Sequence, residues 1–415
     1  APHYLQNLAE VLAAGGDPAG AAECCRRASA LAPADPAPCR MLARFLTALG
    51  DMAGAGAALE RLAELCPDDP AAAANLGETL RARGRFGPAA DAFRRALALA
   101  PDNMDAAYGL GLCLLSLGEM AEGARLYEAG RFGGRRPRLD ILPGVPAWDG
   151  SPMPKGRLLL HPEQGAGDVI QFIRYVPWLK ERVGRLILPH RPDLDRLLRR
   201  VEGIDHRPGP GEPPPACDAF VPLLSLLALF EGRFPAPASY LSADPRAVED
   251  WRKRLSPPDG RARVGLVWAG NPGHHNDRNR SIPLAAFDAL LGLPGVAWHA
   301  LQVGPAAADP ERLGWAGRIT DLSPGIADFA DTAAAISALD LVVTVDTSVL
   351  HLAGAMGRPA WGLIPQVSDW RWVAGREDSA WYPSIRLFRQ ADDGGWPPVL
   401  ARLSRALAEL TPPAE

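Results

Sequence analysis

One segment of the sequence combines hydroxyls, a carboxylate and an imidazole in a way that suits anion binding. Residues Thr344–Ala355 are predicted to form a strand, a polar turn and a helix, with Asp346, Thr347 and Ser348 in the turn. Asp346 or Thr347 can cap the helix, and the free amide groups at a helix N-terminus bind anions. His351 lies one turn into the helix, close to the same point. The alternative is an ordinary helix cap beside a partly buried histidine.

A second segment, His161–Asp168, places two glycines and two carboxylates after another predicted strand. Gly165 and Gly167 permit a tight turn and a close approach of the backbone to a ligand. Asp168 is the first residue of the following predicted helix. It can contact a ligand, or it can serve only as the N-cap of that helix. The dinucleotide-binding fingerprint is not satisfied, because no third glycine follows at the required spacing. Taken alone, this loop does not identify a ligand.

The elements that position these segments are predicted to be parallel strands. From Trp148 onward, short apolar runs alternate with helical stretches in two blocks, and a polar helix over Pro245–Leu255, ending at 256–258, is interpreted as a linker between them. One helix is predicted over Asp168–Arg182. In doubly wound sheets, ligands lie at the carboxyl ends of the strands. The predicted strands cover residues 157–160, 185–189 and 219–223 in the first block, and 264–268, 298–303, 341–345 and 360–364 in the second.

The first third of the chain is built from four repeats of equal length. Each unit carries a leucine at its seventh position, a glycine at its fifteenth and a small residue at its twentieth. Small residues let the two helices of a unit approach closely, while larger residues fill the seam between units. The fourth unit loses its closing proline and ends in the basic loop 133–136, and Pro2 opens a full unit without a polar cap, as expected if further repeats preceded it. The units begin at Pro2, Pro36, Pro70 and Met104.

Composition excludes several classes of protein. The chain has 415 residues, of which 47% are apolar and 22% charged, so it is not disordered as a whole. A net charge of only -4 argues against a dedicated nucleic-acid binder, and no apolar run is long enough for a transmembrane helix. The six cysteines lack paired spacing, which favours reduced thiols and a cytoplasmic location.

These motifs resemble known families. The repeats are similar to the tetratricopeptide repeat over residues 2–137, and the Gly-Ala-Gly-Asp loop and the Asp-Thr-Ser-x-x-His-x-Ala turn resemble heptosyltransferase-like glycosyltransferases of the GT-B fold. The stretches WDGSPMPKGRLLLHPEQGAGDVIQFIRY and DSAWYPSIRLFRQ look like bacterial tetratricopeptide glycosyltransferases, including those that modify flagellin. The resemblance implies an α + α/β fold class: a solenoid over residues 1–137, a Rossmann-like acceptor-side domain over 138–244 and a Rossmann-like nucleotide-sugar domain over 245–415.

The resemblance implies an acceptor site at the glycine loop. In the heptosyltransferases, the aspartate of this loop is the base that deprotonates the acceptor hydroxyl, and it matches Asp168. An inverting transfer needs one such carboxylate. Glu163 lies on the same loop and is the rival base, with Asp168 preferred. His161 is expected either to orient the acceptor or sugar or to be a structural histidine at the strand end.

The resemblance also implies a donor site at the polar turn. Its helix N-terminus, hydroxyls and histidine would stabilise the leaving phosphate in place of a metal ion. We therefore expect a metal-independent enzyme without a cofactor, whose co-substrate is a nucleotide-sugar. The residues implied to hold the donor's diphosphate and ribose are Asp346, Thr347, Ser348 and His351.

Further donor contacts follow by analogy from the second block. The loop after its first strand should reach the donor phosphates through Asn271 and Arg280, and Gln302 should face the base or ribose. The adjacent His274 and His275 lack other ligands and do not suit a metal. Asp193 and Asp195 are interpreted as a solvated helix face. Interdomain packing is favoured over an acceptor cleft for the aromatic residues Trp370, Trp372, Trp381 and Tyr382.

The repeats are expected to recruit the acceptor. Asn7 and Asn75 occupy the inner face of the first helix in two units, and an amide can grip a peptide backbone regardless of its side chains. In protein O-GlcNAc transferases, which this layout resembles, asparagines there contact the bound polypeptide; the alternative is a solvated asparagine. The leading hypothesis is therefore an enzyme acting on a protein, with flagellin the expected acceptor. The alternatives are a transferase for glycan- or lipid-linked acceptors and a non-catalytic adaptor with a decayed transferase domain.

Overall fold

The chain forms two compact units. The computed structural model describes residues 1–133, 142–213, 215–255, 260–274, 276–391 and 395–410. One unit comprises Ala1–Leu139 together with Asp369–Ala374, and the other comprises Asp140–Ser368 and Gly375–Glu415. The fold class is α + α/β, as the sequence predicted, while the boundary predicted at residue 244 stays a prediction.

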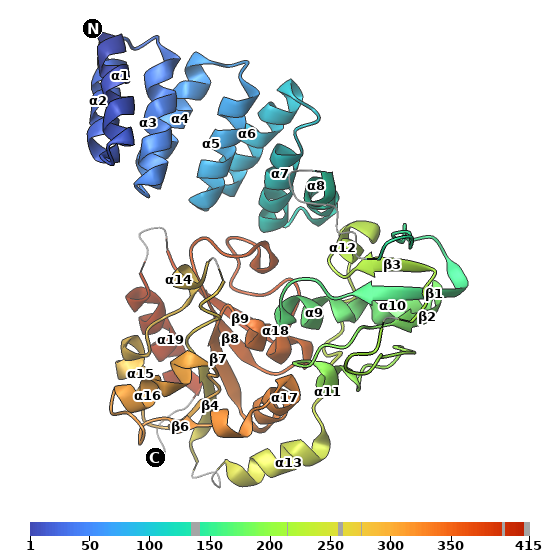
Figure 1. Cartoon of the computed structure of the whole chain (residues 1–415). Coiled ribbons are helices and arrows are strands. Elements are labelled where there is room, and N and C mark those ends of the chain that lie inside the picture. The colour runs from blue at the N-terminus through green and yellow to red at the C-terminus, as the bar shows by residue number, and fades with distance from the viewer. Residues whose placement is uncertain (134–141, 214, 256–259, 275, 392–394, 411–415) are drawn as a thin grey trace. The chain divides into compact units, whose positions relative to one another are not determined.

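The first unit is a solenoid of helix pairs (Figure 1). The first helix of each pair begins at the residue predicted to open a repeat, which confirms the predicted period. The turn glycines adopt positive φ angles between 73° and 86°, a conformation that favours glycine. The helices are α1 (Pro2–Ala14), α2 (Pro18–Leu31), α3 (Pro36–Ala48), α4 (Met52–Leu65), α5 (Pro70–Ala82), α6 (Phe86–Leu99), α7 (Met104–Leu117) and α8 (Met120–Gly133).

Small residues in the array are required by close backbone contact. A Cβ atom added to Gly111 of α7 would lie 2.4 Å from the backbone nitrogen of Tyr127 on α8. A Cβ atom on Gly77 would lie 2.9 Å from the ring of Phe93. Both glycines therefore permit a helix approach that any larger side chain would prevent. Most of the basic loop expected after the fourth unit lies outside the described residues.

A short segment from late in the sequence belongs to this first unit. The segment Asp369–Ala374, which we call the strap, leaves the second unit after its fifth large-sheet strand and returns to it before the sixth. The ring centroid of Trp370 lies 6.2 Å from that of Tyr127, and the Ala374 N–H donates to the Ser116 carbonyl over 2.7 Å. Carbonyls in the last turn of a helix lack intrahelical hydrogen-bond donors. The strap therefore supplies a donor to one of these carbonyls at the end of the array.

The second unit contains two parallel sheets. The smaller sheet has the order β2-β1-β3, and the larger has the order β6-β5-β4-β7-β8-β9, which is the Rossmann arrangement 3-2-1-4-5-6 counted along this block. Every residue of β7 and β8 is buried, as expected for central parallel strands. The strands are β1 (Met153–His161), β2 (Val183–Ile187), β3 (Ala219–Pro222), β4 (Ala262–Val267), β5 (Val296–Ala300), β6 (Thr320–Asp321), β7 (Leu341–Val345), β8 (Ala360–Ile364) and β9 (Ile385–Arg389).

All seven predicted strands are present, and β6 and β9 were not predicted. β6 has only two residues, both exposed, and β9 interrupts its apolar residues with arginines. The prediction of a single helix over 168–182 was wrong. It is divided into α9 (Ala166–Phe172), the 3₁₀ turn η1 (Ile173–Tyr175) and α10 (Val176–Lys180), because Pro177 has no N–H to continue a helical ladder.

The helix predicted as a linker is observed as α13 (Pro245–Arg254), and it packs on α17 (Phe329–Ala338) with Trp251 buried. The end predicted for it at 256–258 lies outside the described residues. The other α-helices are α11 (Asp195–Leu198), α12 (Ser225–Leu229), α14 (Asp277–Arg280), α15 (Asp288–Leu291), α16 (Asp309–Arg312), α18 (Ser348–Ala355) and α19 (Pro397–Leu410). The remaining 3₁₀ turns are η2 (Leu284–Phe287), η3 (Pro305–Ala308), η4 (Ser323–Gly325) and η5 (Trp370–Trp372).

Candidate functional site

The topological switch point of the larger sheet lies between β4 and β7. These strands are paired and parallel, and the chain order runs outward from them in opposite directions. In such sheets the crevice at the carboxyl ends of the two strands is where ligands bind. The loop 268–281 follows β4 and the turn 346–348 follows β7, so both segments predicted from the sequence to contact a donor lie at this crevice.

The turn after β7 leads directly into α18. Thr347 is the N-cap, but its side chain makes no capping hydrogen bond, so the side-chain cap expected from Thr347 is not formed. Instead its hydroxyl lies 3.1 Å from that of the buried Thr344. Asp346 is buried, Thr347 and Ser348 are half-buried, and His351 is buried. The N-terminal amides of α18 therefore begin at the switch point beside these side chains.

Arg280 joins the β4 loop to this turn. Its guanidinium donates from Nη1 to the Asp346 carbonyl over 3.0 Å and from Nε to the Asp277 carboxylate over 3.2 Å. A Cβ atom on Gly270 would lie 2.6 Å from Arg280 Nη2, so the glycine makes room for the arginine. Asn271 lies on the exposed part of the same loop, where its Oδ1 accepts from the Gly273 N–H over 2.9 Å. His275 lies outside the described residues.

Gln302 holds the backbone at the ends of two neighbouring strands. Its Oε1 accepts from the N–H groups of Trp268 and Ala269 over 3.1 and 2.9 Å. Its Nε2 donates to the carbonyls of Ala269 and Val303 over 3.1 and 3.0 Å. The buried Gln302 amide therefore uses both its oxygen and its nitrogen to hold the backbone that borders the crevice. The predicted contact of Gln302 with a base or ribose stays a prediction.

The glycine loop of the smaller sheet uses both of its carboxylates in backbone hydrogen bonds. Gly165 is the N-cap of α9, and its N–H donates to Asp168 Oδ2 over 2.8 Å. The buried Glu163 accepts from the Leu224 N–H over 3.2 Å. Asp168 remains half-buried, and it is thus the more accessible of the two carboxylates. His161 ends β1 half-buried, and desolvation lowers its pKa although the Glu163 carboxylate opposes that change.

The two motifs meet in space. Helix α9 packs against α18 (Figure 1). A Cβ atom on Gly167 would lie 3.0 Å from His351 Cδ2 and 3.5 Å from the Cα of Ser348. The glycine loop and the polar turn lie far apart in the sequence, yet they lie side by side at the N-termini of two helices. This contact places a carboxylate-bearing loop beside a helix N-terminus that attracts anions.

Two residues of this region were given no site role from the sequence. The Arg389 guanidinium, at the end of β9, donates to the Arg376 carbonyl over 2.6 Å and to Ser368 Oγ over 3.3 Å, and burial lowers its pKa to about 10 while the Asp346 carboxylate opposes that change. Tyr382 places its hydroxyl 2.9 Å from His351 Nδ1. Arg389 was not identified from the sequence because β9 itself was not predicted. Tyr382 was not identified because it was interpreted as one member of an aromatic cluster.

The members of that aromatic cluster are all buried, and they belong to different units. Trp370 and Trp372 lie in the strap, whereas Trp381 and Tyr382 lie in the second unit. Trp381 stacks on Phe234 with ring centroids 3.9 Å apart. Burial of this kind agrees with the packing interpretation, and Phe234 and Trp381 lie on opposite sides of the boundary predicted at residue 244.

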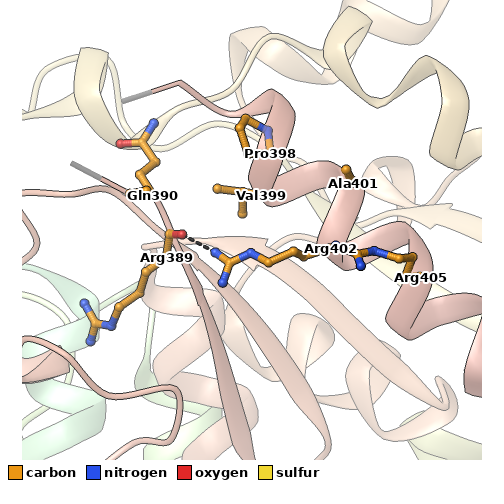
Figure 2. A pocket seen from close by; sticks show the side chains of 8 residues that line it. Arg389, Gln390, Pro398, Val399, Ala401, Arg402 and Arg405 are labelled. Carbon is orange, nitrogen blue, oxygen red and sulfur yellow. Dashed lines mark hydrogen bonds between the residues drawn. The ribbon is translucent and has the colours of Figure 1, made fainter. Parts of the chain in front are cut away.

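A hollow of about 540 Å³ lies near β9, but it contains none of the predicted site residues. Figure 2 shows that the Arg389 backbone carbonyl accepts a hydrogen bond from Arg402 at this hollow, while the Arg389 guanidinium extends away from Arg402. Its lining residues are Arg389, Gln390, Ala391, Pro398, Val399, Ala401, Arg402 and Arg405.

The two asparagines predicted to bind a partner belong to the repeat array. Asn7 and Asn75 are exposed on α1 and α5 of the repeat array. Asp193 and Asp195 do not form the solvated helix face expected from the sequence: Asp193 lies in a turn before α11, both are half-buried, and they pair with Arg191 and Arg199. Among the described residues, no group of three or more histidine, cysteine or acidic side chains is placed to hold a metal ion, and no helix is both long and apolar enough to cross a membrane.

Family models match three stretches of the chain. Two tetratricopeptide-repeat models match residues 12–77 and 74–136, and the model of glycosyltransferase family 9 (heptosyltransferase) matches residues 307–374. The last stretch includes the whole polar turn and His351. Protein FlbA of Caulobacter vibrioides is 30% identical over 329 residues, which are 71% of this chain and 53% of FlbA. The chain therefore spans about half the length of this curated relative.

Solved structures resemble part of the chain. MamA 41-end from Desulfovibrio magneticus RS-1 is 21% identical, with 31% of this chain and 73% of that one covered and a TM-score of 0.30. Another crystal structure of MamA is 25% identical, with coverages of 30% and 72% and a TM-score of 0.29. YrrB, described as a TPR protein with an unusual peptide-binding site, is 17% identical, with coverages of 31% and 66% and a TM-score of 0.29.

The family matches and FlbA confirm the resemblance drawn from the sequence. The chain carries tetratricopeptide repeats followed by a stretch that matches the model of glycosyltransferase family 9, and 71% of this chain is similar to FlbA.

Proposed function

We propose that the chain is a nucleotide-sugar-dependent glycosyltransferase of the GT-B type that acts on a protein acceptor recruited by the repeats. The observation that carries this proposal is the contact between the glycine loop and the polar turn, with Gly167 against His351 at the switch point. It joins a loop that offers a carboxylate to a helix N-terminus that suits a diphosphate. The family 9 match over the same turn supports the assignment.

The proposed reaction is a single inverting displacement that needs no metal. The acceptor hydroxyl oxygen bonds to the anomeric carbon as the bond from that carbon to the phosphate oxygen breaks. The electron pair of the broken bond goes to the nucleoside diphosphate, which the amides of α18 and Arg280 stabilise. The hydroxyl proton passes to Asp168. The base must lie on the face of the sugar opposite the diphosphate, because the attack is in line.

Isosteric amides separate the two candidate bases. Asn at position 168 can still accept the Gly165 N–H, and Gln at position 163 can still accept the Leu224 N–H, so neither change removes the structural hydrogen bond. We expect Asp168→Asn to lower kcat by at least about a hundredfold with little change in melting temperature or nucleotide affinity. Glu163→Gln is the matched control and should retain most activity. Full activity of Asp168→Asn would assign the base elsewhere.

A nucleotide screen tests the enzyme against the adaptor alternative. Thermal shift is measured with UDP, GDP, ADP and CMP and with their sugar conjugates, because a ligand bound only by the folded state raises its stability. An active transferase should be stabilised by one nucleotide family, and His351→Gln should reduce that stabilisation. If no nucleotide at millimolar concentration stabilises the protein, the adaptor with a decayed domain is favoured. The intact carboxylate loop and polar turn support the enzyme.

The repeats are proposed to hold the acceptor protein, with flagellin as the first acceptor to test. Deleting the array would remove the partner of the strap and expose Trp370, so point variants are cleaner. Asn7→Ala and Asn75→Ala change only exposed amides. We expect the double variant to raise KM for the protein acceptor while hydrolysis of the donor is unchanged. Unchanged KM would contradict the groove, and transfer only to free glycans or lipid-linked sugars would support the other acceptor classes.

A further inference from the structure

His351 is held between two different environments. Its Nδ1 lies 2.9 Å from the hydroxyl of Tyr382, and both side chains are buried, with 6% and 1% of their surface exposed. On the other flank of the ring, Cδ2 is the atom nearest the glycine loop, 3.0 Å from the position of a Cβ atom on Gly167. Nε2 is bonded to Cδ2, so the nitrogen on the loop side of the ring is Nε2. One nitrogen therefore meets the Tyr382 hydroxyl, and the other lies on the side of the ring that faces the glycine loop.

A glycine in helix α18 allows Tyr382 to approach His351. A Cβ atom on Gly354 would lie 2.4 Å from Tyr382 Cγ, so only glycine lets the tyrosine ring lie against the helix. The rings of His351 and Tyr382 are edge to face, with centroids 5.7 Å apart and planes at 71°. Gly354 lies three residues after His351 and therefore on nearly the same face of the helix. The hydrogen bond is thus fixed by packing as well as by distance.

A buried cation lies behind Tyr382. Arg174, in η1, has 1% of its surface exposed, and its guanidinium carbon lies 4.9 Å from the centroid of the Tyr382 ring. No ion pair in the described part of the chain includes Arg174. Its charge is instead solvated by carbonyls, a hydroxyl and aromatic faces. Its hydrogen-bond acceptors are the carbonyls of Gln171, Pro235 and Trp381 and the hydroxyl of Tyr240.

This charge favours one direction of the hydrogen bond to His351. A positive charge over a phenol ring stabilises the electron density that moves to oxygen when the hydroxyl donates, and the effect is strong where water is excluded. The same charge opposes a second positive charge on the nearby imidazole. Both effects favour a neutral imidazole that accepts at Nδ1 from the Tyr382 O–H. A neutral imidazole that accepts at Nδ1 carries its proton on Nε2.

We propose that Tyr382 and Arg174 are positioning residues that fix His351 in the tautomer with its proton on Nε2, the nitrogen on the glycine-loop side of the ring. His351 lies in the first turn of α18, so this N–H would donate to an anionic oxygen of a diphosphate bound at the N-terminus of that helix. The inference about the tautomer stands on the contacts above, and its use for the diphosphate rests on the proposed function.

Selective ¹⁵N labelling of histidine tests the tautomer directly. The two neutral tautomers and the imidazolium differ in their ring nitrogen shifts, and the His351 signals are assigned by their loss in His351→Gln. We expect Nε2–H in the wild-type protein at pH 7.5 and a mixture of tautomers in Tyr382→Phe. Tyr175→Phe is the matched control. It removes a hydroxyl that donates to the Arg233 carbonyl, from a buried ring close to the same cluster. This change should leave the His351 nitrogen shifts unchanged.

An Nδ1–H tautomer or an imidazolium in the wild-type protein would overturn the proposal, as would unchanged His351 shifts in Tyr382→Phe. The second readout is affinity for the nucleoside diphosphate that stabilises the wild type most in the thermal screen. We expect Tyr382→Phe to bind it about tenfold more weakly and Tyr175→Phe to bind it normally. Equal affinity in Tyr382→Phe and the wild type would refute the role in donor binding. If the wild type binds no nucleotide, the proposed function fails, but the nitrogen shifts still decide the tautomer.

Discussion

The repeat array and the two-sheet unit are stabilised over very different distances along the chain. In the array, Arg44 pairs with Glu10 one repeat away, over 2.6 Å and 34 residues. In the two-sheet unit, Arg174 donates to the Trp381 carbonyl across 207 residues. The array is therefore assembled from neighbours in sequence, each unit packing on the next, whereas the candidate site exists only when distant segments meet. The strap is the exception, because a late segment completes the end of the array.

The largest expected effect tests how tightly the array depends on small residues. Gly111→Ala places a methyl group 2.4 Å from the Tyr127 backbone nitrogen, which cannot move without separating α7 from α8. We expect a loss of about 3 kcal/mol in the free energy of unfolding of the array. Gly87→Ala is the matched control, because that helical glycine has nothing within 4 Å and its replacement should stabilise the protein slightly. Urea unfolding followed by circular dichroism measures both, and equal stability of the two variants would contradict the close-contact argument.

A smaller effect tests whether the strap is part of the array. Trp370→Ala removes a ring that has 5% of its surface exposed and lies beside Tyr127. We expect a loss of about 2 kcal/mol, at the low end for burial of a large side chain because the strap can adjust. Hydrogen exchange measured by mass spectrometry should show faster exchange in α7 and α8. Faster exchange confined to β8 and β9 would show that the strap stabilises the sheet instead.

The smallest effect is a pH dependence that only the two-sheet unit should show. His299 in β5 is buried with neither ring nitrogen hydrogen-bonded, and desolvation first, then Arg263 and Arg261, lowers its pKa from 6.5 to about 4. The unfolded chain binds this proton more readily than the folded one, so stability falls as the pH drops from about 6.5 toward 4. At pH 5.5 the loss is about 1.4 kcal/mol.

His299→Leu should abolish this component while preserving stability at pH 8, where the histidine is neutral in both states. Urea midpoints measured from pH 8 to 5 for the wild type and the variant give the difference. The same slope in both proteins would show that other groups cause the acid sensitivity. A larger slope in the variant would show that His299 is protonated in the folded state.

Much of this protein was predictable because its patterns are local. The repeat period, the turn glycines and all the described strands except β6 and β9 follow from residue spacing, and so do the two loops at the switch point. Each depends on contacts within a helix pair or on alternation of apolar residues along one element. The break at Pro177 and the short β6 were missed because pattern strength is weak over a few residues.

The sequence by itself determined the architecture and the chemical types at the site: a solenoid, two parallel sheets, a carboxylate loop and a histidine near a helix N-terminus. Only the tertiary structure decided that Gly167 lies against His351, that Tyr382 holds its Nδ1, and that Asp168 is more accessible than Glu163. The physical reason is that these contacts join segments far apart in the chain. The periodicity of residues within one segment does not predict which distant segment its side chains will contact.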